Sequence, residues 1–279
     1  MITKQNLILR SKDKKPILYD LYYKESRSSI PLVIFCHGYK GFKDWGAWHL
    51  VAEAFANAGF CFLKLNFSHN GGTIEQPIDF PDLEAFAENN FSHELDDLDR
   101  VINSITSGNE NIQQNISTIS LIGHSRGGGT VLIKAEEDKR INKVITWASV
   151  CDFKARFQEN TPEFENWKKN GVTYVENSRT KQNLPHNFQF YEDFKVNEER
   201  FTIKRAAKSL SIPLLILHGE EDPTVSLREA QAIHSWKKDS ILKIIPGADH
   251  VFGAKHPWEI DTMPNDLQKV VKETIDFLN

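Results

Sequence analysis

The chain has 279 residues and a net charge of −4, a length that allows one large domain or two small ones. So mild a negative charge excludes the basic surface that nucleic-acid binding requires, and no nucleic-acid partner is expected. No apolar run reaches the length of a membrane span, and the first residues lack the apolar core of a signal peptide. We therefore expect a cytoplasmic protein without a membrane partner.

The three cysteines also favour a cytoplasmic protein. Cys36, Cys61 and Cys151 are odd in number, and each lies in an apolar context. Buried free thiols of a reducing compartment are expected, without a disulfide framework.

The first part of the chain predicts a hairpin followed by a buried strand. Residues 6–11 and 17–23 alternate around a turn-prone segment, which is typical of an antiparallel hairpin at a sheet edge. Residues 31–36 form a continuous apolar run, the pattern of a strand buried on both faces of a parallel sheet. A helix over about 45–58 and a strand over 60–67 follow.

The middle of the chain continues this alternation after a break. Residues 73–90 are polar, contain two prolines and predict a loop. Ser92 is placed to cap a helix with an apolar stripe. A strongly apolar run over 116–122 predicts the next strand, a helix follows over 130–135, and 144–148 predicts the sixth strand.

Between Asp152 and about Phe201 the alternation of strands and helices stops. Roughly 50 residues without a clear strand exceed an ordinary connection, which predicts an insertion with a structure of its own. The insertion is rich in aromatic side chains, which predict either a cap that supplies an apolar pocket and excludes water, or a miniature core of its own. We expect one domain, 1–279, with a cap at 153–202 inserted between the sixth and seventh strands.

The alternation resumes in the last third of the chain. A helix over 203–209 precedes a strand over 213–218, and a helix over 226–238 precedes a strand over 241–245. A final helix covers about 264–278. Repeated alternation of this kind predicts an α/β fold with a mostly parallel, doubly wound sheet. Ligands bind at the carboxyl ends of the strands in such sheets.

One short pattern stands between a predicted strand and a predicted helix. Residues 123–127 read Gly-His-Ser-Arg-Gly, and this context is typical of a nucleophile elbow with Ser125 at its apex. The glycines at 127–129 lack the Gly-Lys-Ser/Thr ending of a phosphate loop and indicate close helix packing instead.

Two later strand ends offer an acid and a base for this serine. Asp222 follows the seventh predicted strand, and His250 follows the eighth. A serine hydroxyl needs a base to take its proton, and the base needs a carboxylate to fix its tautomer. Glu220, Glu221 and Asp152 compete with Asp222 for the carboxylate role. His256 precedes a proline and is expected in a loop.

The order Ser, Asp, His and three motifs resemble the α/β-hydrolase superfamily over nearly the whole chain. The motifs are Gly-His-Ser-x-Gly-Gly, His-Gly-x-x-Asp-x-x-Val and Asp-His, and they are most similar to the dienelactone-hydrolase and small-esterase branch. The resemblance implies that Ser125 attacks, Asp222 orients, and His250 acts as general base and then general acid. It also implies an oxyanion hole from the backbone N–H groups of Tyr39 and Arg126.

We therefore expect a serine hydrolase, a carboxylic ester hydrolase that cleaves small or medium acyl esters through an acyl-enzyme. The alternatives are a serine peptidase or amidase of the prolyl-oligopeptidase-like type and a ligand-binding protein without activity. No cofactor is expected. No cluster has the spacing of a metal site, and His69, His93 and His124 are expected as polar surface or supporting groups. The sequence leaves the substrate-binding residues and the oligomeric state open, a homodimer included.

Overall fold

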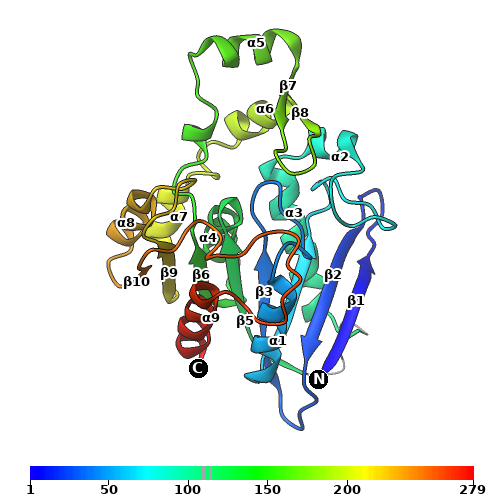
Figure 1. Cartoon of the computed structure of the whole chain (residues 1–279), viewed down its shortest axis with the longest axis vertical. Helices are drawn as coiled ribbons and strands as arrows, with labels where there is room; N and C mark the ends of the chain where they lie inside the picture. Colours follow the sequence, from blue (N-terminus) through cyan, green and yellow to red (C-terminus); the bar gives the residue numbers. More distant parts are fainter. Residues whose placement is uncertain (109–110, 113–114) are drawn as a thin grey trace.

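A computed structural model describes residues 1–108, 111–112 and 115–279. Its centre is an eight-stranded sheet in the order β1-β2-β4-β3-β5-β6-β9-β10 (Figure 1). The strands of this sheet are β1 (Ile2–Leu9), β2 (Ile17–Tyr23), β3 (Ile30–Cys36), β4 (Cys61–Asn66), β5 (Ile116–His124), β6 (Ile141–Trp147), β9 (Leu214–Gly219) and β10 (Ile241–Ile245).

The sheet is mostly parallel, as its apolar strands predict. β2 runs antiparallel to both of its neighbours, β1 and β4, and every other neighbouring pair is parallel. The predicted hairpin at the sheet edge is confirmed, although β1 begins earlier than expected, at Ile2. β2 is buried along its whole length rather than alternately, because both of its edges are paired and both of its faces are covered.

Helices cover both faces of the sheet and bury two apolar clusters. One cluster joins the sheet to α3, α4, α7 and α8, and the other joins it to α1 and α9 (Figure 1). These helices are α1 (Trp48–Asn57), α3 (Phe91–Thr106), α4 (Arg126–Glu137), α7 (Ile203–Ser209), α8 (Leu227–Trp236) and α9 (Asn265–Leu278). The predicted doubly wound α/β architecture is confirmed. Within the part of the chain that the structure describes, no helix has the length and apolarity to cross a membrane.

The insertion between β6 and β9 lies over the carboxyl ends of the strands (Figure 1). It holds a short 3-10 helix, η1 (Lys154–Arg156), then α5 (Pro162–Asn170), the hairpin β7 (Val172–Glu176) and β8 (Asn183–Asn187), and α6 (Gln189–Val196). The sequence predicted no strand here. The hairpin was missed because β8 carries a proline and two asparagines, and because β7 is mostly exposed.

Two local predictions near α3 were wrong. The expected loop over 73–90 contains α2 (Leu83–Glu88), which the side chain of Asp82 caps by accepting a hydrogen bond from Ala85 N–H. The cap of α3 is Asn90, which accepts from His93 N–H, and not Ser92. The cap of both helices is one of the usual Asp or Asn choices, and in α3 it lies two residues before the expected Ser92.

Four charged groups form a buried network beside β2 and β4. Lys64 and Lys43 both contact the carboxylate of Asp20, and all three side chains are at most 1% exposed. Both lysines also contact Asp44, which is one-third exposed. Burial alone would raise the pKa of Asp44, but Lys64 and Lys43 outweigh that effect and lower it. The network has equal numbers of positive and negative charges, so each buried charge is compensated.

Removing one lysine from this network should destabilise the fold. In the variant Lys64→Met, Asp20 and Asp44 must share Lys43, which leaves buried charge without compensation. We expect the free energy of unfolding to fall by about 3–5 kcal/mol, measured by urea denaturation. The exposed pair of Lys272 and Asp276 offers a control, since Lys272→Met should leave the midpoint unchanged. A loss below about 1 kcal/mol for Lys64→Met would contradict this account.

Candidate active site

The turn between β5 and α4 holds Ser125 in a strained conformation. Its φ is 56° and its ψ is −121°, a region that non-glycine residues rarely occupy. The backbone of Ser125 is fixed on both sides, because its N–H donates to Trp147 O at 2.9 Å and its carbonyl accepts from Gly128 N–H at 3.0 Å. The turn therefore projects the Ser125 side chain beyond the end of the sheet, as a nucleophile elbow requires.

Glycine is required where the strand and helix of this turn approach each other. A Cβ on Gly123 would lie 2.2 Å from Gly127 O, and a Cβ on Gly127 would lie 2.5 Å from Cys36 O. No side chain fits at either position. The prediction that these glycines serve close helix packing is confirmed.

The structure brings the three predicted catalytic side chains together. His250 Nε2 lies 3.1 Å from Ser125 Oγ, and His250 Nδ1 lies 2.7 Å from Asp222 Oδ2. The Asp222 side chain is fully buried, and that of His250 is 15% exposed. Since a carboxylate only accepts, Nδ1 carries a proton and Nε2 is free to accept the Ser125 hydroxyl proton. This is a hydrogen-bonded series from carboxylate to imidazole to hydroxyl.

Asp222 is held in its ionised form by several donors. Its Oδ1 accepts from Thr224 N–H and Val225 N–H, both at 2.8 Å, and its Oδ2 also lies 3.3 Å from His218 Nε2. Burial alone would raise the pKa of Asp222, but the hydrogen bonds from His218, His250 and Val225 outweigh burial and hold it well below its usual range. The carboxylate therefore stays charged at neutral pH.

His218 is a supporting residue that the sequence analysis did not single out. It is fully buried at the end of β9, and its Nε2 donates to Val225 O at 2.8 Å, which closes the loop that carries Asp222. The sequence signal for this role is a histidine at the end of a buried strand, four residues before the predicted acid Asp222. Local sequence could not reveal the role, because it depends on how the loop folds back.

Two of the three competing carboxylates accept hydrogen bonds from backbone N–H groups elsewhere. Asp152 Oδ1 accepts from Lys154 N–H at 2.8 Å, and Glu220 Oε2 accepts from Gly247 N–H at 3.2 Å. The backbone N–H of Glu221 donates to Ala248 O, which helps to shape the loop. Asp222 is thus the carboxylate in contact with His250.

The loop after β3 lies directly against the serine. A Cβ on Gly38 would come within 2.7 Å of the Cβ of Ser125 and 3.3 Å of its Oγ. His37 is buried beneath the loop, with Nδ1 donating to Gly38 O at 2.9 Å, so it helps to shape the loop. This packing places the loop after β3, which continues into Tyr39, against Ser125.

The side chain of Arg126 forms a buried ion pair. Its Nη2 donates to Glu94 Oε1 of α3 at 2.5 Å, and Glu94 is 2% exposed. Glu94 also accepts from Thr130 Oγ1 at 3.2 Å and Asn89 Nδ2 at 3.0 Å. The guanidinium lies over the ring of Tyr39, with 5.2 Å to the ring centroid. The residue after the serine is therefore anchored through its side chain.

A cavity of about 460 Å³ lies between Ser125 and the insertion. Its walls are mostly apolar, and the residues that line it include Phe91, Phe153, Phe157, Phe164, Trp167, Phe190, Val150 and Val225. Several of these rings also pack together, for example Phe91 on Phe153 at 4.0 Å between centroids. The aromatic side chains of the insertion therefore form an extension of the core and the wall of a cavity at once.

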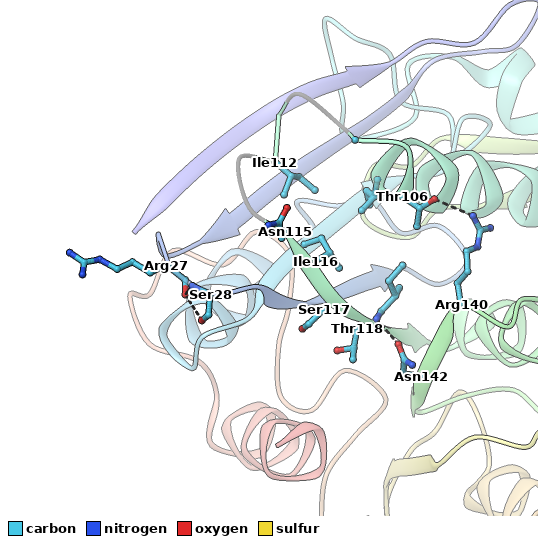
Figure 2. Close-up of a pocket in the computed structure, with 14 residues that line it drawn as sticks. Arg27, Ser28, Thr106, Ile112, Asn115, Ile116, Ser117, Thr118, Arg140 and Asn142 are labelled. Carbon is cyan, nitrogen blue, oxygen red and sulfur yellow. Dashed lines mark hydrogen bonds between the residues drawn. The ribbon is translucent and has the colours of Figure 1, made fainter.

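A larger hollow of about 680 Å³ lies at the other end of β5 (Figure 2). Its lining includes Ile116 and Ile119, which are six to nine residues before Ser125 and so roughly 20–30 Å away. Its polar groups serve the fold: Asn142 accepts from Ile119 N–H, and Arg140 bonds to Asp138 and Thr106. The catalytic side chains are not near it.

The other histidines that the sequence singled out lie outside the hydrogen-bonded series of Ser125, His250 and Asp222. His124 is buried and shares a hydrogen bond with His250 O at 2.9 Å. His69 and His93 stack on each other with 4.0 Å between ring centroids. His256 Nδ1 accepts from Gly46 N–H at 2.9 Å. No group of three or more potential metal ligands comes together among residues 1–108, 111–112 and 115–279.

A family model described as "alpha/beta hydrolase fold" matches residues 31–182, which include the elbow and the loop after β3. The chain belongs to the α/β-hydrolase fold family. Among curated proteins, it is similar to the human serine hydrolase BPHL, with 25% identity over 164 residues, which are 53% of this chain and 54% of that protein. The matched region thus spans about half the length of that relative.

Solved structures of similar fold include an esterase and a peptidase. Est1E from Butyrivibrio proteoclasticus with ferulic acid bound is similar to this hydrolase-family chain with a TM-score of 0.76 and 17% identity, covering 98% of this chain and 97% of that one. The acylaminoacyl peptidase of Pyrococcus horikoshii gives a TM-score of 0.68 and 15% identity, covering 98% of this chain and 41% of that one. At identities of 15% and 17%, these similarities show a shared fold alone.

The buried histidines of the site should make the protein labile to acid. Burial lowers the pKa of His37 to about 4 and that of His124 to about 3, so both stay neutral in the folded state when the unfolded chain takes up protons. The contribution of these two neutral histidines to stability is therefore fully present above pH 6.5 and is lost as the pH falls below it. From pH 7 to pH 5, each histidine should cost about 2 kcal/mol of unfolding free energy.

Urea unfolding of wild type and His124→Gln at both pH values tests this expectation. The variant lacks one of these titrating histidines, so its stability should fall less between pH 7 and pH 5, by about 2 kcal/mol. An equal fall in the two proteins would contradict the assignment of this lability to His124.

Proposed function

We propose that the protein is a serine hydrolase of the carboxylesterase type, which cleaves small or medium acyl esters through an acyl-enzyme. One observation carries the proposal. Ser125, His250 and Asp222 form a hydrogen-bonded series at the apex of an elbow, and Ser125 opens into a cavity large enough for an acyl group.

In the acylation step, Ser125 Oγ attacks the ester carbonyl carbon while its proton passes to His250 Nε2. The ionised Asp222 stabilises the imidazolium that forms. When the tetrahedral intermediate collapses, the bond to the alcohol oxygen breaks and His250 gives its proton to that oxygen. The alcohol leaves, and the acyl group remains on Ser125.

In the deacylation step, a water attacks the acyl carbon and gives its proton to His250 Nε2. The bond to Ser125 Oγ then breaks, the serine regains a proton from His250, and the carboxylic acid is released. No metal or cofactor enters either step.

The negative oxygen of each intermediate needs two donors. We assign them to the backbone N–H groups of Tyr39 and Arg126, as the family resemblance implies. The contact of Gly38 with Ser125 supports this assignment, because it places the loop that carries Tyr39 beside the serine oxygen that adds to the ester carbonyl. Fixed backbone donors stabilise such an oxygen by a few kcal/mol each.

The cavity favours an ester over a peptide with a free amino end. Its lining includes two arginines but a single carboxylate, Glu163, which lies on the first turn of α5 and is exposed. The buried Glu94 is already paired with Arg126. A single exposed carboxylate beside two arginines is a poor site for an ammonium group. The apolar walls suit an acyl chain or ring, and ferulic acid, bound to Est1E, is an aromatic acid.

Removal of the Ser125 hydroxyl should abolish the reaction. We expect Ser125→Ala to lower kcat for a p-nitrophenyl ester by several orders of magnitude, with Tm unchanged within a few degrees, because the nucleophile is lost and the elbow backbone remains. A labelled fluorophosphonate should modify wild type at Ser125 and leave the variant unmodified. Full activity of Ser125→Ala, or an unlabelled Ser125 in folded wild type, would disprove the proposal.

The same assay separates the alternatives. A higher kcat/KM for an anilide than for the ester of the same acid would favour the peptidase or amidase. One acylation without turnover would indicate a binding protein that has kept the site.

The size of the cavity should limit the length of acyl chain that the protein prefers in its ester substrate. Each methylene buried against its aromatic wall contributes about 0.8 kcal/mol, or roughly fourfold in kcat/KM. We therefore expect kcat/KM to rise steadily from p-nitrophenyl acetate to the hexanoate, and to stop rising when the cavity is full. A preference for acetate over every longer chain would show that the acyl group does not enter this cavity.

A further inference from the structure

A hydrogen bond joins the loop beside the serine to the inserted cap. Tyr39 Oη and His186 Nε2 lie 2.7 Å apart, although the two residues are 147 positions apart in sequence. Tyr39 belongs to the loop after β3, and His186 belongs to β8 of the cap hairpin. The rings also contact each other, with 5.5 Å between their centroids. The side chain of a proposed oxyanion donor is thus held by the cap.

His186 is itself firmly placed in the cap. Its carbonyl accepts a hydrogen bond from Trp167 Nε1 of α5 at 2.8 Å, and its ring packs on Phe86 of α2 at 5.2 Å between centroids. Leu184, also in β8, is fully buried in a small cluster with Phe42, Phe80 and Phe86, against which Tyr39 packs. The β8 strand therefore forms one wall around the loop.

Both partners of the hydrogen bond are neutral at pH 7. Burial raises the pKa of Tyr39 to about 12. Burial, with the nearby charges of Arg126 and Lys40, lowers the pKa of His186 to about 4. A neutral hydroxyl and a neutral imidazole can share the proton without a charged state, so the contact persists over the pH range in which esters are assayed.

The second oxyanion donor is connected to the cap as well. The guanidinium of Arg126 lies 5.2 Å from the ring of Tyr39 and 5.9 Å from the ring of Phe190 in α6. Glu94 holds this guanidinium from the side of α3. Tyr39 and Arg126, which flank Ser125, therefore also contact each other through their side chains, under α6 and β8.

We propose that His186 is a positioning residue for the reaction: by holding the Tyr39 side chain, it fixes the backbone N–H of Tyr39 in the oxyanion hole. The proposal rests on the ester hydrolase function proposed above. Gly38 and Gly41 on either side give the loop little stiffness of its own, and a turn with Gly41 N–H donating to Gly38 O closes it. The side chain of Tyr39 is then the anchor that sets where its N–H points.

The kinetic consequence follows from what an oxyanion donor does. The donor acts on the intermediate and not on the bound ester, so its displacement should lower kcat and leave KM nearly unchanged. Loss of a whole donor costs about 100- to 1000-fold in related chemistry. Loss of an anchor, with the donor still present, should cost less, about tenfold.

The test is a double-mutant cycle with Tyr39→Phe and His186→Leu. We expect each single variant to lose about tenfold in kcat with KM changed less than twofold, and the double variant to lose no more than either single one. A trifluoromethyl ketone, whose adduct with Ser125 places an oxygen in the oxyanion hole, should bind about tenfold more weakly to all three. Tyr174→Phe is the matched control, because Tyr174 lies on β7, is 61% exposed and does not line the cavity, so its kinetics should equal wild type.

Amide hydrogen exchange supplies a readout that does not depend on activity. The peptide that covers residues 37–45 should exchange faster in Tyr39→Phe and His186→Leu than in wild type, and unchanged in Tyr174→Phe. Multiplicative losses in the double variant, an effect confined to KM, or unchanged exchange over 37–45 would overturn the proposal. The two proposals can fail separately. If wild type reacts with fluorophosphonate and hydrolyses esters, and Tyr39→Phe and His186→Leu have the kinetics of wild type, the positioning role of His186 is disproved and the hydrolase function remains supported.

Discussion

The close approach of β5 and α4 is the constraint on which the site depends. Gly123 and Gly127 allow the strand and helix backbones to meet, and this forces Ser125 into a conformation with positive φ. The strain is held by backbone hydrogen bonds to β6 and to the first turn of α4. Without this contact the serine would lie within the sheet, out of reach of His250.

The other parts of the site are arranged around that fixed point by the parallel sheet. Asp222 and His250 follow β9 and β10, which lie on the same side of β5, so their loops meet at one edge. The loop after β3 reaches Ser125 from the other side. The order of strands thus separates the acid and base from the loop that carries Tyr39, with Ser125 and Arg126 between them.

Several buried charged groups in this molecule occur in compensated sets. Glu94 is matched by Arg126, Asp222 accepts from two backbone N–H groups and two imidazoles, and Lys64 has carboxylates on both sides. Each set joins elements that are distant in sequence. They therefore act as specific ties between elements, which apolar packing alone does not provide.

The sequence by itself determined the layered α/β architecture and the order of the predicted catalytic residues along the chain. Continuous apolar runs and helical stripes depend on local periodicity, so most strands and helices of the main sheet were predicted within a few residues. The elbow motif has the same local origin, since glycine is needed wherever two backbones touch. Asp222 and His250 were identified because strand ends meet at one edge in this class of fold.

Tertiary structure alone decided the features in which distant segments meet. The β7–β8 hairpin, the supporting role of His218 and the hydrogen bond between Tyr39 and His186 have no periodic pattern. A polar strand such as β8 becomes ordered because Leu184 is buried against residues from three other segments. The free energy that fixes these contacts comes from partners far along the chain, and a local window of sequence does not contain them.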